Sequence, residues 1–160
     1  MAVKILQFLA IVLTALSLVP GGAHLFELPN KIGLPQEAYF TVQAIYRGWA
    51  LFGFVLVPAL LVNLLLAFAV RHSVRSSALA LMAAVLMAAN LAIFFGWTYP
   101  ANVATENWTT PVPGWEALRA QWEYSHAVNA VLTFGALCLV VLSTLAAATP
   151  HTPAGRPAPP

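Results

Sequence analysis

Residues 49–70 read WALFGFVLVPALLVNLLLAFAV, an apolar run without a charged side chain. A helix that rises about 1.5 Å per residue needs roughly 20 apolar residues to cross a hydrocarbon core about 30 Å thick. The run is long enough to do this, whereas the buried helices of soluble domains seldom contain so long an apolar stretch. It therefore predicts a helix that spans a membrane.

The composition of the whole chain indicates the same class of protein. Of its 160 residues, 61% are hydrophobic and 8% are charged, whereas about a quarter of the residues of a soluble domain are charged. We therefore expect an integral membrane protein with the lipid bilayer as its surroundings. The net charge of +2 comes from a few scattered basic residues, so we expect no nucleic-acid partner.

Four apolar segments predict an all-α fold, an antiparallel bundle of four transmembrane helices. The helices are expected within one domain, residues 1–148, at about 3–27, 36–70, 77–97 and 115–148. The first segment also has features of a secretory signal peptide, but we favour a membrane span. The last residues, 149–160, are rich in Pro and predict a disordered tail.

The distribution of basic residues predicts the orientation of the bundle. One end of the predicted bundle carries Lys4, Arg71, Arg75 and Arg156. Because cytoplasmic loops of membrane proteins are enriched in Lys and Arg, we expect both termini to be cytoplasmic. The two longer connections, 27–40 and 98–121, then lie at the outer end. Long connections are usually functional, so we expect the functional site there.

Two pairs of His and Glu, written in mirrored order, form the candidate site. His24 precedes Glu27 near the end of the first predicted helix, and Glu123 precedes His126 near the start of the fourth. Residues three apart share a helical face, and helical rise places the two His residues at nearly the same depth. If the first and last helices are neighbours, the four side chains form a ring.

These residues suggest metal binding or proton transfer. Ionisable groups within a membrane are costly unless they are paired or bind a metal. We predict that a divalent ion, whether iron, copper or zinc, is bound by His24, Glu27, Glu123 and His126. A carboxylate of Glu27 or Glu123 that does not bind metal would be the catalytic base. The two His residues could instead be axial ligands of haem, and each pair could be only an interfacial ion pair.

Other polar and aromatic residues are expected near the same depth. We predict that they bind substrate or support the ligands; they are Gln43, Tyr46, Arg47, Asn90, Trp97, Asn102, Trp122 and Asn129. The Trp residues could alternatively form an aromatic belt at the membrane interface. Asn63 lies deeper, and we expect it to form a hydrogen bond between helices.

Three stretches resemble a known family. GGAHLFELPNKIGL (21–34), YPANVATENWT (99–109) and WEALRAQWEYSHAVNAV (115–131) are similar to the small four-helix membrane proteins grouped around the anthrone oxygenases. The resemblance implies a membrane enzyme that oxidises an activated aromatic carbon with O2. Many members carry Asn and Arg in the fourth helix, where this chain has His126 and Asn129. That departure suggests a site rebuilt around His and Glu for a different substrate.

Together these features predict an oxidoreductase, a metal-dependent oxygenase, that acts on a small lipophilic substrate entering from the bilayer. Two alternatives stay open: an electron-transfer protein that binds haem, and a membrane subunit without enzymatic activity. The Ala-rich stretch 78–90 of the third helix would also permit a homodimer, because small residues let helices approach closely.

Overall fold

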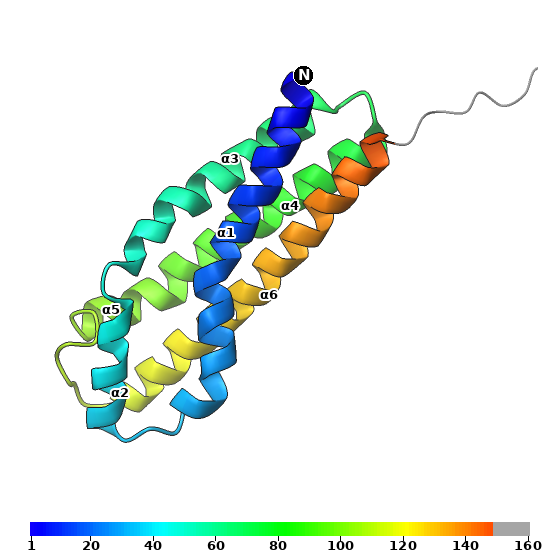
Figure 1. Ribbon diagram of the computed structural model, residues 1–160. Helices are drawn as coiled ribbons and strands as arrows, with labels where there is room; N and C mark the ends of the chain where they lie inside the picture. The colour runs from blue at the N-terminus through cyan, green and yellow to red at the C-terminus, as the bar shows by residue number, and fades with distance from the viewer. Residues whose placement is uncertain (149–160) are drawn as a thin grey trace, which may run out of the picture.

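The computed structural model describes residues 1–148, which form an all-helical bundle (Figure 1). Four helical stretches are long and apolar enough to cross a membrane, namely Ala2–Lys31, Trp49–Ala69, Val74–Ala104 and Trp115–Ala147. The prediction of an all-α four-helix bundle is therefore confirmed, and the four stretches are those of a multi-pass membrane protein. The cytoplasmic location of both termini stays a prediction, and the predicted disordered tail, 149–160, lies outside the described residues.

The four long helices pack in a ring in which neighbours run in opposite directions (Figure 1). α1 (Ala2–Lys31) contacts α3 (Gly53–Ala69) and α6 (Trp115–Ala148), and α4 (Val74–Ile93) contacts the same two helices. The first and last helices are therefore antiparallel neighbours. This arrangement places the last turns of α1 beside the first turns of α6, at what we call the site end of the bundle.

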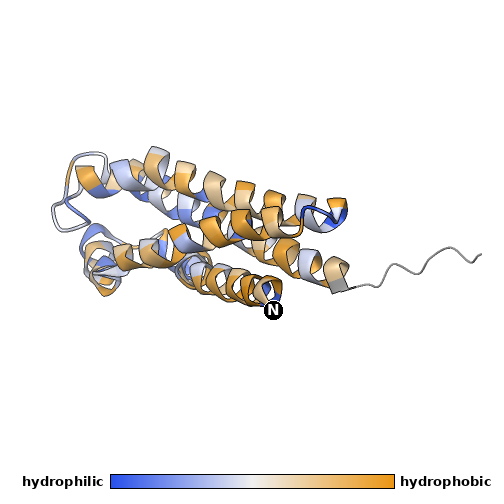
Figure 2. Cartoon of the chain, turned by 90° about the horizontal axis from the view of Figure 1, so that it is seen from above, coloured by the Kyte–Doolittle hydropathy of each residue, from blue (hydrophilic) through white to orange (hydrophobic). Residues whose placement is uncertain are grey.

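Small and apolar residues fill the bundle away from the site end. The buried cluster there consists of Ala10, Ala59, Leu66, Ala67, Val70, Ala80, Ala83, Met87, Ala136 and Val140. Large apolar side chains such as Phe8, Phe68 and Phe134 are exposed instead, and apolar residues extend along the helices (Figure 2). Lipid tails are as apolar as these side chains, so their exposure is compatible with a bilayer and the helices associate mainly through close packing.

The Ala-rich stretch of α4 takes part in this packing. Ala80, Ala83 and Ala84 are buried within the chain, so this part of the stretch is not available to a second copy. The homodimer stays a prediction and would have to use another surface. Asn63 behaves as expected, because its amide Nδ2 donates a hydrogen bond of 3.0 Å to Thr14 Oγ1 and joins α3 to α1.

The second predicted helix, 36–70, is interrupted. α2 (Gln36–Gln43) ends in a short turn, and the chain then changes direction at Gly48, whose φ of 89° lies in the left-handed region. Gly adopts this conformation without steric cost. A short 3₁₀ segment, η2 (Trp49–Phe52), leads into α3. The break lets α2 lie across the site end (Figure 1).

At the site end, α1 and the continuation of α4 extend further than predicted. α1 passes Pro20 and Pro29 and continues to Lys31, which adds one turn at the site end. α4 continues through a π-helical turn, η3 (Phe94–Thr98), into α5 (Tyr99–Ala104). After α5 the chain turns back toward α6 through three residues with positive φ, Glu106, Asn107 and Trp108.

A close contact at Gly21 brings α1 and α6 together about three turns before the end of α1. A Cβ atom at Gly21 would lie 3.2 Å from the Cα atom of Ala130 on α6, whereas a Cβ atom at Gly22 would have nothing within 4 Å. A side chain at Gly21 would therefore push the two helices apart.

We predict that Gly21→Leu lowers the free energy of unfolding by about 1–3 kcal/mol, the usual cost of an overpacked contact. Gly22→Leu is the matched control, and it should leave stability unchanged or raise it, because Leu favours a helix over Gly by up to about 1 kcal/mol. Thermal unfolding of both variants in the same detergent measures the difference. Equal stability of the two variants would show that the contact at Gly21 does not hold α1 against α6.

Candidate functional site

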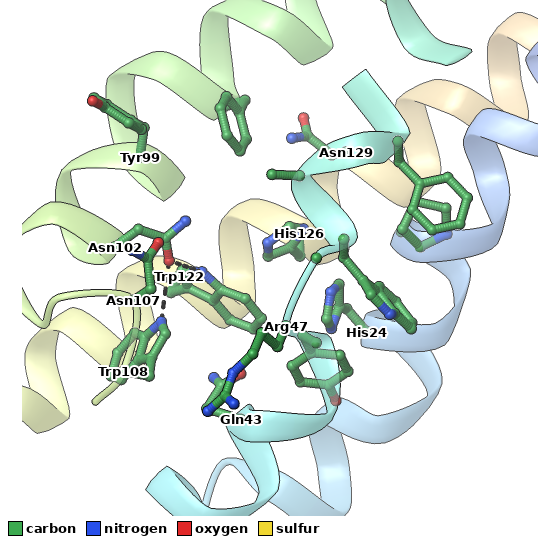
Figure 3. Close-up of a pocket in the computed structure, with 18 of the residues that line it drawn as sticks. His24, Gln43, Arg47, Tyr99, Asn102, Asn107, Trp108, Trp122, His126 and Asn129 are labelled. Carbon is green, nitrogen blue, oxygen red and sulfur yellow. Dashed lines mark hydrogen bonds between the residues drawn. The ribbon is translucent and has the colours of Figure 1, made fainter. Parts of the chain in front are cut away.

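The structure places His24 of α1 beside His126 of α6, with ring centroids 4.3 Å apart (Figure 3). His24 is buried and His126 is half-buried. Aromatic rings enclose the pair, because His24 also contacts Tyr46, Trp49 and Trp122 at centroid distances of 4.4, 5.4 and 4.8 Å. The Trp122 ring also lies 4.2 Å from the ring of His126.

A buried Lys, absent from the predicted site, binds both predicted carboxylates. The Nζ atom of Lys31 lies 3.1 Å from Glu123 Oε1 and 3.6 Å from Glu27 Oε2. It also donates a hydrogen bond of 2.9 Å to the hydroxyl of Tyr46, which in turn donates to Glu27. Glu123 is 0% exposed and Lys31 is 3% exposed. Since a buried charge is costly without a partner, the ammonium group is the counter-ion of these carboxylates.

The spacing of Lys31 in the sequence is a signal for its place in the site. Lys31 follows Glu27 by four residues and His24 by seven, which is the spacing of one helical face. The predicted end of the first helix at residue 27 places Lys31 in a connecting loop. The additional turn of α1 instead directs Lys31 toward α6.

The contacts of Lys31 with Glu27 and Glu123 compete with the predicted metal centre. Among residues 1–148, no three His, Cys, Asp or Glu side chains are placed to hold a metal ion. His24 and His126 offer two imidazole nitrogens, but Glu27 and Glu123 bind Lys31 instead. The described residues therefore do not fit the four-ligand centre. Haem would require the two rings, 4.3 Å apart, to separate enough for a porphyrin between them. Metal and haem binding stay predictions.

Tyr39 of α2, which the sequence did not predict as a site residue, adds two hydrogen bonds to the contacts around Glu123. Its hydroxyl donates a hydrogen bond of 2.8 Å to Glu123 Oε1 and accepts one of 2.5 Å from Gln43 Nε2. Burial, followed by the adjacent Glu123 carboxylate, raises the pKa of Tyr39, so the phenol keeps the proton that it donates. No periodicity of the sequence pointed to Tyr39, because its position depends on the break at Gly48.

Asn102 of α5 is fixed by two indole groups. Its Oδ1 atom accepts hydrogen bonds from Trp122 Nε1 at 2.8 Å and from Trp108 Nε1 at 3.2 Å (Figure 3). An indole N–H can only donate, so the Asn102 side chain must present its oxygen to both rings. Its Nδ2 group is thereby left to donate elsewhere.

A cavity of about 1380 Å³ lies beside the imidazoles. Most of the predicted site residues line it, namely His24, Gln43, Tyr46, Arg47, Asn90, Asn102, Trp122, His126 and Asn129. Within the described part of the chain, Glu27, Glu123 and Trp97 are not among its lining residues; Trp97 is 56% exposed. The structure therefore places most of the predicted polar residues around one cavity, whereas the carboxylates of Glu27 and Glu123 lie outside its lining.

One wall of the cavity is apolar. Its lining residues there are Phe52 of η2, Leu56 of α3, and Phe94 and Phe95 of η3. All four lie inside two of the membrane-spanning stretches. Phe95 is also 62% exposed on the outside of the bundle. The cavity thus adjoins the surface that lipid would cover.

Comparison with protein-family models, with curated proteins and with solved structures gives no match to this chain. The resemblance to the anthrone oxygenases therefore stays a prediction. The function has to be inferred from the geometry of the site.

We predict that Lys31→Met lowers the free energy of unfolding by about 3 kcal/mol, because it leaves Glu123 buried without a counter-ion. The double variant Lys31→Met with Glu123→Gln should recover part of this loss, since it removes the uncompensated charge. Lys4→Met, at an exposed position in the first turn of α1, is the control. The free energies of unfolding of the wild type and the three variants are compared in one detergent. A Lys31→Met protein as stable as the Lys4→Met protein would contradict the prediction.

Proposed function

We propose that the chain is an integral membrane oxidoreductase that oxidises a small lipophilic substrate with dioxygen in the cavity at the site end. One observation carries the proposal: the adjoining imidazoles of His24 and His126 lie in the wall of a large cavity with aromatic and apolar surroundings. Ligand sites typically combine a mostly apolar concave surface with a few polar groups of this kind.

The position of the cavity supports a lipophilic substrate. Its apolar wall belongs to membrane-spanning stretches, and Phe95 faces both the cavity and the outside. A hydrophobic molecule dissolved in the bilayer would reach the cavity along this wall without passing through the headgroup layer. The volume of about 1380 Å³ exceeds the range of roughly 300–1,000 Å³ of most ligand pockets, so a substrate of several fused rings would fit.

His126 is the residue to which we assign the base. Its imidazole is half-buried and lines the cavity, so an unprotonated ring nitrogen can accept a proton from an acidic C–H or O–H group of the substrate. Glu27 and Glu123, the bases predicted from the sequence, suit this role less well. Both are bound by Lys31, and neither is among the residues that line the cavity.

The amide of Asn102 suits the second part of the reaction. Loss of a proton leaves negative charge on the substrate, and the Nδ2 group can donate a hydrogen bond to the oxygen on which that charge develops. The electron-rich anion then reacts with dioxygen. A CH2 group and one O2 become a C=O group and one water, so the reaction balances without an added reductant. The resemblance to the anthrone oxygenases supports the oxidation of an activated aromatic carbon with O2.

We predict that the purified protein consumes dioxygen when anthrone is supplied as a probe, and that His126→Ala lowers the rate by about 10²- to 10⁴-fold, the usual contribution of a general base. Tyr124→Ala is the matched control, because Tyr124 lies on the same turn of α6 but is 56% exposed. An oxygen electrode measures the rate, and elemental analysis of the same samples measures bound metal.

The outcomes separate the alternatives. Binding of anthrone without oxygen consumption by a folded wild-type protein would contradict the oxidase and leave a lipophilic-ligand-binding protein. Equal rates for His126→Ala and Tyr124→Ala would remove His126 from the mechanism. Stoichiometric metal that is lost in both His24→Ala and His126→Ala would replace the proposed base chemistry with a metal-dependent reaction.

A further inference from the structure

Three buried side chains that line the cavity carry polar atoms without a hydrogen-bond partner. These atoms are His24 Nδ1, Gln43 Oε1 and Asn129 Oδ1, none of which has a hydrogen-bond partner among residues 1–148. All three residues line the cavity and are 5% exposed or less. A buried polar atom without a partner carries a free-energy cost, so a ligand that supplies the missing partner would gain affinity from it.

The orientation of Gln43 is dictated by the groups behind it. The Glu123 carboxylate can only accept hydrogen bonds, so the Tyr39 hydroxyl, 2.8 Å away, must donate its one hydrogen to Glu123. The hydroxyl must then accept the 2.5 Å hydrogen bond from Gln43. The NH2 group of Gln43 therefore faces Tyr39, and its Oε1 atom is left as a fixed acceptor.

The buried ion pair completes this chain of hydrogen bonds. Lys31 Nζ lies 3.1 Å from the same Oε1 atom of Glu123 that accepts from Tyr39. The ammonium group favours the ionised carboxylate, and the carboxylate fixes the direction of the Tyr39 hydroxyl. An ion pair that the proposed reaction does not use thus sets the polarity of a side chain at the cavity.

We propose that Gln43 is a ligand-binding residue whose Oε1 atom accepts a hydrogen bond from a hydroxyl group of the ligand, and that Lys31, Glu123 and Tyr39 hold it in this orientation. The ligand class is a hydroxylated aromatic molecule, discriminated from its methyl ether, which has no hydrogen to donate. The inference rests on the proposed cavity site for lipophilic ligands, but it does not depend on their oxidation.

The test compares two probes, 2-naphthol and 2-methoxynaphthalene, on the protein in lipid nanodiscs, with binding to empty nanodiscs subtracted. We expect wild type to bind 2-naphthol about tenfold more tightly, the effect of one buried hydrogen bond and the unpaired atom it satisfies. Gln43→Met should bring the ratio of the two dissociation constants close to one. Tyr39→Phe should lower it too, because the Gln43 amide then loses the hydroxyl that orients it.

Tyr124→Phe is the matched control, because it removes the same hydroxyl group from an exposed Tyr on α6 and should leave the ratio unchanged. If Tyr39→Phe does not fold, Gln43→Met, which keeps the hydrogen bond from Tyr39 to Glu123, carries the test alone. A wild-type protein without preference, or a Gln43→Met protein that keeps it, would overturn the inference.

Oxygen consumption measured on the same samples separates this inference from the proposed function. A preference for 2-naphthol in a protein that consumes no oxygen with anthrone would leave the role of Gln43 standing and contradict only the oxidase. Oxygen consumption in a protein that binds both naphthalenes equally would contradict only the role of Gln43.

Discussion

The buried ion pair between Lys31 and Glu123 is the interaction on which the site end depends. It joins the last turn of α1 to the first turns of α6 at 3.1 Å. Tyr39 of α2 donates a hydrogen bond to Glu123, and Lys31 donates one to Tyr46 in the turn after α2. An ionised group without its partner would be costly at this depth. Helices that associate in lipid without a hydrophobic driving force are thereby held in one arrangement.

The Trp122 ring lies against both the ion pair and the imidazoles. The Lys31 ammonium lies 4.9 Å from the centre of the Trp122 ring, while that ring contacts the imidazoles of His24 and His126. The indole therefore connects the ion pair to the wall of the cavity, which Trp122 lines. A ligand there meets imidazoles, amides and aromatic rings, together with the charged side chains of Glu37, Arg47 and Glu106. In the described part of the chain, Lys31 and Glu123 do not line the cavity, so this ion pair acts on a ligand through the side chains that it orients.

The sequence alone predicted the bundle and the meeting of His24 and His126, because both depend on helix length and direction, which hydrophobic runs and helical rise supply. It did not predict that Glu123 would bind Lys31. Four ligand-type residues at one depth suggest a metal centre only if no cation competes, and one further turn of α1 supplied that cation. Tyr39 was not predicted either. A Gly inside a helical pattern is compatible with a continuous helix, so Gly48 gave no sign of the break on which the position of α2 depends.

Helical geometry decides which residues of α6 line the cavity, which one binds Lys31 and which ones are exposed. Trp122, His126 and Asn129 follow one another by four and three residues and line the cavity, since this spacing keeps them on one face. Glu123 lies about 100° further round the helix axis, at 3.6 residues per turn, and meets Lys31. Tyr124, one residue later, is exposed. Consecutive residues thus face the cavity, the ion pair and the outside, so a one-residue shift of α6 would expose Glu123 to the cavity and remove His126 from it.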